Sequence, residues 1–228
     1  MTSYTRADWL IPAGLVELSF IDIAAGIFRM VQLGGSAEIT PDNARFFAAP
    51  LPVVLHIVSS VIYCVLGAFQ FSPSLRRHKP TWHRAGGRIL VPCGLVVALS
   101  GLWMTQFYPT VNFKGPFVYV LRLVVGSAMA SFLCLGLASI RRGDISCHRA
   151  WMMRSYALGI GAGTQAFTLL PWLLLPSIQG ELARAVCLGA GWAINVALAE
   201  WLISGQRHQQ LESLSRRGIN SANFNKFR

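Results

Sequence analysis

The sequence predicts an all-α fold, a polytopic transmembrane helix bundle with six spans. Two observations lead to this prediction: long apolar runs follow one another along the chain, and strongly basic loops alternate with weakly basic ones between them. Of the 228 residues, 54% are hydrophobic and only 13% are charged, whereas soluble domains contain roughly 25% charged residues. Lipid is therefore the expected solvent for much of the surface.

Six apolar runs define the predicted spans, because a helix that crosses a bilayer needs roughly 20 mostly apolar residues. The runs are residues 9–31, 51–72, 89–107, 117–140, 151–175 and 185–203. The first is the least apolar, since it contains Glu17, Asp22 and Arg29, and it lacks the pattern of a cleaved signal peptide. We expect one six-span membrane domain over residues 1–203, followed by a basic, partly disordered cytoplasmic tail over residues 204–228.

The distribution of Lys and Arg predicts the orientation. The loops after the second and fourth spans and the tail together carry fourteen of these residues, whereas the other three loops carry one each: Arg45, Lys114 and Arg184. Basic loops stay on the cytoplasmic side, so both termini are expected in the cytoplasm and the protein in the cell inner membrane. Topology and anionic lipid headgroups account for the net charge of +11, and a nucleic-acid partner is not expected.

Two of the basic loops contain the same phrase. Residues 76–85 read RRHKPTWHRA and residues 141–150 read RRGDISCHRA, which aligns Arg76 with Arg141 and His83 with His148. Each phrase joins two spans, the second to the third and the fourth to the fifth. A duplicated helical hairpin explains this pattern; independent convergence on a basic loop is the alternative.

A first candidate site lies toward the outer side. The second span carries a stripe of polar and small residues on one helix face: His56, Ser59, Ser60, Tyr63, Gly67 and Gln70. His56 and Arg122 each lie five residues into their spans, about 8 Å below the outer surface at the rise of an α-helix. A cationic pocket balanced by Asp22 is one interpretation. The alternatives are a packing face between helices and an arginine that extends outward to water.

A second candidate site lies toward the cytoplasm. His83 and His148 begin the third and fifth spans, Arg88 and Arg154 follow each of them, and Glu200 lies near the inner end of the sixth span. Such a site could bind an anionic lipid headgroup, a quinone ring or a single haem b held by the two histidines. The alternative is anchoring at the interface, where aromatic residues flank cations; they would be Trp82, Trp151 and Trp201.

The sequence contains no recognisable catalytic motif and predicts no metal site. The five cysteines form no C-x-x-C pair, and hydrolase, P-loop and zinc-protease patterns do not occur. Three functions stay open: binding of a small molecule at the cytoplasmic His/Arg site, which is favoured; transport of a small solute or protons through a cavity at His56 and Arg122; and a scaffold role as a homo-oligomer or as a subunit of a larger membrane complex.

Four segments resemble a known family. They read LHIVSSVIYCVLGAFQFSPSLRR, WHRAGGRILVPCGLVVALSGLWM, CHRAWMMRSYALGIGAGTQAFTLLP and WAINVALAEWLI. Over roughly residues 50–204 the chain resembles the predicted bacterial multipass membrane proteins known as domain of unknown function twenty-three-oh-six. The resemblance implies a polytopic bacterial membrane protein and no particular reaction. The matching positions are His56, Gln70, Arg77, His83, Arg84, Gly87, Arg88, His148, Arg149, Trp151, Arg154, Ala157, Asn195 and Glu200.

Overall fold

The computed structural model describes residues 6–35, 37–109 and 115–224, and this part of the chain contains helices and no strand. Proline begins α4, α5, α6 and α7, as suits a first helical turn whose N–H groups have no helical partner. The elements are α1 (Arg6–Leu18), α2 (Phe20–Gly34), α3 (Ala44–Ala48), α4 (Pro50–Gln70), α5 (Pro73–His78), α6 (Pro80–Phe107), α7 (Pro116–Arg141), α8 (Ile145–Gly159), α9 (Gly161–Thr168), α10 (Leu170–Leu174), the 3-10 turn η1 (Pro176–Ile178) and α11 (Glu181–Phe224).

The predicted all-α membrane bundle is confirmed. Within the described residues, α4, α6, α7 and the part of α11 up to Gln206 are each long and apolar enough to cross a membrane. The first and fifth predicted spans are bent helix pairs: α1 and α2 meet at 45°, and α8 meets the α9–α10 segment at 44°. The chain therefore has four straight candidate spans, or six if each bent pair crosses as one span.

Each bend has a local cause. At the first, the Ser19 hydroxyl donates to the Leu15 carbonyl at 3.0 Å, a side-chain bond that competes with the helical ladder and bends helices. At the second, Ile160 lies between Gly159 and Gly161, and glycines are a common cause of helix kinks. The two bends meet, because a Cβ at Gly163 of α9 would collide with the backbone of Leu18.

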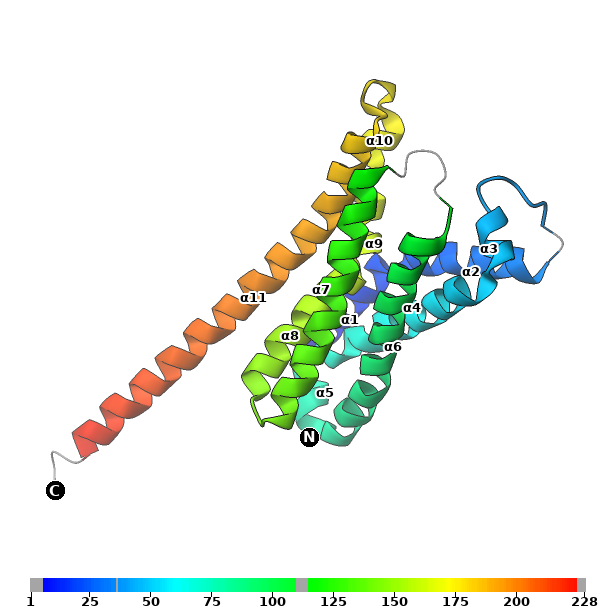
Figure 1. Ribbon diagram of the computed structural model, residues 1–228. Coiled ribbons are helices and arrows are strands. Elements are labelled where there is room, and N and C mark those ends of the chain that lie inside the picture. The colour runs from blue at the N-terminus through cyan, green and yellow to red at the C-terminus, as the bar shows by residue number, and fades with distance from the viewer. Residues whose placement is uncertain (1–5, 36, 110–114, 225–228) are drawn as a thin grey trace.

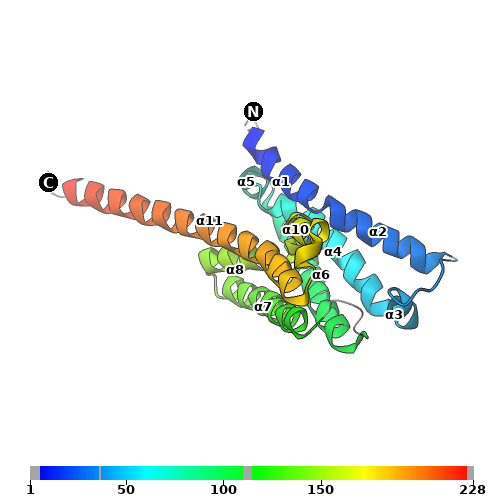
Figure 2. The same cartoon turned by 90° about the horizontal axis from the view of Figure 1, so that it is seen from above.

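The helices form a bundle with two distinct ends. α4 packs along α6, α6 along α7 and α7 along α8, while α11 packs on α9, α8 and α7, and α1 and α2 lie on α4. Figure 1 shows α5 and the turn between α7 and α8 at one end, which we call the basic end. α3 and α10 lie at the other, which we call the α3 end. The later part of α11 extends beyond the bundle, as Figures 1 and 2 show.

The turn at the basic end is set by two residues. Gly143 has a φ of 77°, a left-handed conformation that glycine adopts without steric cost. Asp144 then caps α8, because its carboxylate accepts the backbone N–H of Cys147 at 2.9 Å. His148 is thereby placed in the first turns of α8, just as His83 lies in the first turns of α6.

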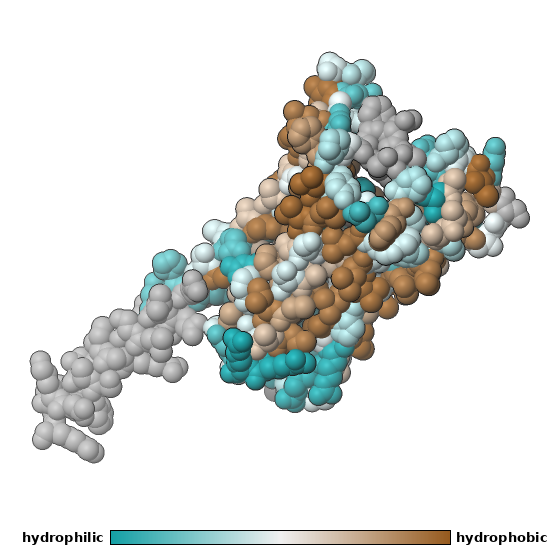
Figure 3. Space-filling view, in the orientation of Figure 1, coloured by the Kyte–Doolittle hydropathy of each residue, from teal (hydrophilic) through white to brown (hydrophobic). Residues whose placement is uncertain are grey.

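The surface agrees with a membrane location. In Figure 3, hydrophobic side chains cover the middle of the bundle and hydrophilic ones gather at the basic end and at the α3 end. Large apolar side chains are exposed along α7, among them Phe117, Val124 and Leu135. Lys114, Lys226 and Arg228, which contribute to the loop charges, lie outside the described residues.

The core is organised around one tyrosine. Tyr63 of α4 is buried, and its hydroxyl lies 3.0 Å from the Ser155 hydroxyl of α8. Its ring fits between two glycines, Gly94 of α6 and Gly159 of α8, where a Cβ at either position would lie 2.7 Å from a ring carbon. Tyr156 packs beside it at 5.7 Å between ring centres. The polar stripe of the second span is therefore in part a packing surface.

Candidate functional site

A cavity of about 570 Å³ lies among α2, α4, α6, α7, α9 and α11. It extends from Arg45 and Tyr108 at the α3 end to Ser19 and Leu158, beside the two bends. Cavities that hold small molecules have volumes of about 300–1,000 Å³ and mostly apolar walls with few polar groups. Here the charged and strongly polar lining residues are Asp22, Arg29, Arg45, His56, Arg122 and Gln165.

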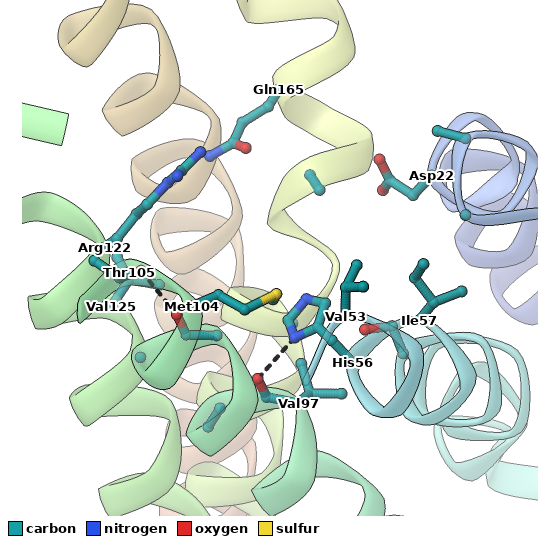
Figure 4. Close-up of a pocket in the computed structure, with 18 of the residues that line it drawn as sticks. Asp22, Val53, His56, Ile57, Val97, Met104, Thr105, Arg122, Val125 and Gln165 are labelled. Atoms are coloured by element: carbon teal, nitrogen blue, oxygen red, sulfur yellow. Dashed lines mark hydrogen bonds between the residues drawn. The ribbon is translucent and has the colours of Figure 1, made fainter. Parts of the chain in front are cut away.

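His56 is fixed by its helix neighbours. Its Nδ1 lies 3.0 Å from the Val97 carbonyl oxygen and 3.0 Å from the Ser100 hydroxyl. A carbonyl can only accept, so Nδ1 carries the proton. The other ring nitrogen points toward the interior of the cavity (Figure 4). Gly101 lies against the ring, and a Cβ there would make an ordinary contact with it at 3.4 Å. His56 therefore offers Nε2 to a bound molecule.

Arg122 enters the cavity from α7. In Figure 4 its guanidinium approaches the Gln165 amide of α9, which is itself held by a bond from Nε2 to the Leu188 carbonyl at 3.0 Å. Among the described residues no carboxylate pairs with Arg122, and its strongest charged neighbours are Arg45 and Arg184. The guanidinium thus lies in a cationic environment with donors left to bind an anion.

Asp22 faces the same cavity from α2, on the side opposite Arg122 (Figure 4). The structure therefore brings Asp22, His56 and Arg122 around one cavity. No ion pair joins Asp22 to an arginine within the part of the chain that the structure describes. With three arginines and one aspartate in its lining, the cavity has an excess of positive charge.

Sequence reasoning missed the residues at the mouth of the cavity. The guanidinium carbons of Arg29 and Arg45 lie 4.3 and 4.6 Å from the centre of the Phe46 ring, within the range of cation–π contacts. Tyr108 packs on Phe46 at 5.5 Å and donates its hydroxyl to the Ala49 carbonyl at 2.6 Å. Burial, and then the charge of Arg29, lower the pKa of Arg45. The available signal was the Arg45–Phe46 pair just before the second span.

At the basic end, the structure pairs Arg154 with Glu200. Arg154 donates from Nε and Nη2 to the two carboxylate oxygens of Glu200 at 2.5 and 2.8 Å, a bidentate geometry. Its guanidinium also lies 4.7 Å from the Trp151 ring centre. This pair holds α8 to α11 and leaves Arg154 with few free donors.

The other cytoplasmic candidates have different surroundings. His148 donates from Nδ1 to the Gly136 carbonyl at 2.8 Å and interacts electrostatically with His83, whose Nδ1 is buried without a hydrogen-bond partner. The Gln70 amide is likewise buried and unpartnered, and Arg88 is exposed. The large cavity reaches none of these residues.

No metal cluster is present in the described ranges, where no three His, Cys, Asp or Glu residues come together. The cysteines, all of which lie in these ranges, are free thiols. The donors that could contact a bound molecule are therefore those of the cavity and of the basic end.

Comparison with known proteins gives one family match. Residues 53–203 match the family described as “Predicted membrane protein (DUF2306)”. No curated protein and no solved structure matches the chain. The matched range includes His56, Arg122 and Gln165, but three charged residues of the cavity lining lie before it: Asp22, Arg29 and Arg45.

Proposed function

Because the chain belongs to the DUF2306 family of predicted membrane proteins, we propose that it acts within the bilayer, binding a small organic anion in the cavity at Arg122 and carrying it across the membrane. The observation that carries the proposal is an arginine that pairs with no carboxylate of the described residues, in a cavity of about 570 Å³. A guanidinium removed from water needs a compensating charge, and a carboxylate or sulfonate could accept bonds from both of its edges.

The apolar walls define the rest of the solute. Val53, Ile57, Val97, Met104 and Val125 surround the charged groups (Figure 4). Removing apolar surface from water contributes about 25 cal/mol per Å², so a solute with one negative group and a compact hydrocarbon body fits both parts of the site. His56 Nε2 and the Gln165 carbonyl oxygen are acceptors, because His56 Nδ1 and Gln165 Nε2 donate to backbone carbonyls. They suit a hydroxyl or amide donor on the body of the solute.

The bent helices favour transport over simple binding. In several transporter folds, interrupted helices surround the substrate site near the middle of the bilayer. Here both bends border the same cavity, through Ser19 on one side and Gly159 on the other. They also touch each other at Leu18 and Gly163, so movement at one bend would be transmitted to the other.

The proposed orientation follows from charge. The basic end carries the double arginines at 76–77 and 141–142, and basic segments face the cytoplasm. In a bacterial inner membrane this orientation places both termini inside the cell and opens the mouth at Arg45 and Tyr108 to the outside. The solute would then enter from the outer face.

Binding of toluenesulfonate to purified protein in lipid nanodiscs tests the proposal. This probe combines a permanent negative charge with an apolar ring; benzyltrimethylammonium is the cationic control. We expect wild-type protein to bind toluenesulfonate and Arg122→Gln to bind it about 10- to 100-fold more weakly, since a hydrogen bond to a charged group contributes about 1.5–3 kcal/mol. Arg88→Gln removes the same charge at the exposed basic end and should bind normally.

Transport is measured separately in proteoliposomes, because a sulfonate stays ionised and does not cross the bilayer unaided. Uptake that requires Arg122 supports the full proposal. Binding without uptake would overturn the transport part, and equal binding by the two variants, or preference for the cation, would overturn the site itself. Thermal melting of each variant shows whether the bundle stays folded.

A further inference from the structure

Side chains of the two basic phrases interact electrostatically at the basic end. α5, which contains Arg76, lies near the turn between α7 and α8 (Figure 1). Arg149 is the charged group that acts most strongly on Arg76, and His83 interacts electrostatically with both Arg76 and His148. Four cationic or titratable side chains, two from each phrase, therefore form one cluster: Arg76, His83, His148 and Arg149.

The two arginines of this cluster, Arg76 and Arg149, are partly buried. Among the described residues, neither Arg76 nor Arg149 makes a hydrogen bond or an ion pair with a carboxylate. Burial and then the charges of Arg149 and Arg77 lower the pKa of Arg76. Two like charges held together out of water destabilise the bundle unless an anion lies between them.

Buried polar atoms of the same region are also unpartnered. Nδ1 of His83 and both amide atoms of Gln70 are removed from solvent without a hydrogen bond. Gln70 lies directly against Gly86, where a Cβ would collide with its amide nitrogen, and Gly86 is one helical turn after His83. Such orphaned groups are rare in folded proteins, and they are expected where a bound molecule supplies the missing bonds.

The carboxylate of the adjacent turn, Asp144, is hydrogen-bonded within that turn. Asp144 is exposed and accepts bonds from the Cys147 N–H and the Ser146 hydroxyl, both at 2.9 Å. Glu200 is held by Arg154. Neither carboxylate forms an ion pair with Arg76 or Arg149 in the part of the chain that the structure describes.

We propose that Arg76, His83, His148 and Arg149, with the Gln70 amide, form a phosphate-binding site at the basic end, separate from the anion cavity. A phosphate has several acceptor oxygens, which suits two guanidinium forks together with imidazole and amide donors. The phosphate belongs either to the headgroup of an anionic phospholipid, because the cluster lies at the membrane interface, or to a soluble phosphate compound.

The test compares two double variants of equal charge. Arg76→Gln/Arg149→Gln removes the two partly buried arginines, and Arg77→Gln/Arg142→Gln removes two exposed arginines from the same loops. Binding of phosphatidylglycerol is measured by native mass spectrometry against phosphatidylcholine, and binding of inorganic phosphate by calorimetry in detergent. We expect Arg76→Gln/Arg149→Gln to bind at least about tenfold more weakly than the wild type, which corresponds to the loss of one hydrogen bond to a charged group. The affinity of Arg77→Gln/Arg142→Gln should stay within about twofold of the wild-type affinity.

The two measurements distinguish the source of the phosphate. A headgroup site retains phosphatidylglycerol and binds free phosphate weakly, whereas a soluble-ligand site binds inorganic phosphate without lipid. Equal losses of affinity in the two double variants would show that overall charge alone attracts anions, and this result would overturn the site. Failure of the wild-type protein to bind either probe would also overturn it. If the first variant does not fold, Arg76→Gln alone is compared with Arg77→Gln under the same criteria. Binding at Arg122 is unaffected by either outcome.

Discussion

Alanine at Gly94 should destabilise the bundle because it presses on the Tyr63 ring. The added Cβ would lie 2.7 Å from Cε2 of Tyr63 and 2.9 Å from a Leu133 methyl carbon. The ring cannot move away freely, since Gly159 faces the opposite edge and a Cβ there would lie 2.7 Å from Cε1. The Ser155 hydroxyl, 3.0 Å away, also fixes the position of the tyrosine.

The magnitude follows from two opposing effects. Extra atoms in a packed core typically cost about 1–3 kcal/mol, whereas replacing glycine by alanine in a helix favours folding by about 1 kcal/mol. Gly87→Ala in the same helix is the matched control, because a Cβ there meets nothing within 4 Å. Helix propensity cancels between the two variants, so Gly94→Ala should be about 2 kcal/mol less stable than Gly87→Ala. The Gly94→Ala/Gly159→Ala double variant should lose more than the sum of the single losses, since both alanines compress one ring.

The assay is equilibrium unfolding in bicelles, with melting in detergent as a second measurement. Replacing Tyr63 by leucine in the Gly159→Ala background should recover part of the loss, because the colliding edge is removed. If Gly94→Ala and Gly87→Ala unfold with the same free energy, the tyrosine does not organise the core as described.

Three further outcomes are expected. Arg154→Ala should reduce the free energy of unfolding by about 1 kcal/mol, as for a partly exposed ion pair, because it leaves Glu200 unpaired; Arg154→Lys should recover part of this in the same unfolding assay. Backbone and hydroxyl hydrogen bonds hold the pKa of Asp144 below the ordinary value of 3.8, so its contribution to stability is complete above about pH 4 and is lost as the pH falls further. In Asp144→Asn the melting temperature should therefore fall less steeply below about pH 4 than in the wild type. Gly163→Ala should lower the melting temperature more than Gly14→Ala, because its Cβ meets the α1 backbone whereas Gly14 faces open space.

The sequence predicted the spans well because hydropathy reports on length and composition. It could not predict the bends at Ser19 and Ile160, since a bent and a straight helix of the same composition are equally apolar. Gly94 and Gly159 lie at the same distance after His83 and His148, but this spacing predicts no common contact. Their shared contact with Tyr63 depends on how α4 packs between α6 and α8, which no local pattern specifies.

Prediction of the candidate sites was uneven for a similar reason. Counting residues from the span ends was enough to put His56 and Arg122 at one depth, and the structure brings them to the same cavity. From the sequence Arg45 is only a loop charge, because its proximity to the Phe46 ring and to Arg29 depends on how α3 lies beside α2. Likewise Arg154 and Glu200 lie toward the same side of the membrane by sequence, but only side-chain geometry shows that they pair with each other.

The most direct test of the central claim is the affinity for toluenesulfonate of three proteins in nanodiscs: wild type, Arg122→Gln and Arg88→Gln. We expect only Arg122→Gln to bind more weakly than the wild type, by about 10- to 100-fold, with unchanged melting behaviour. Wild-type affinity in a folded Arg122→Gln protein would contradict an anion site at this arginine.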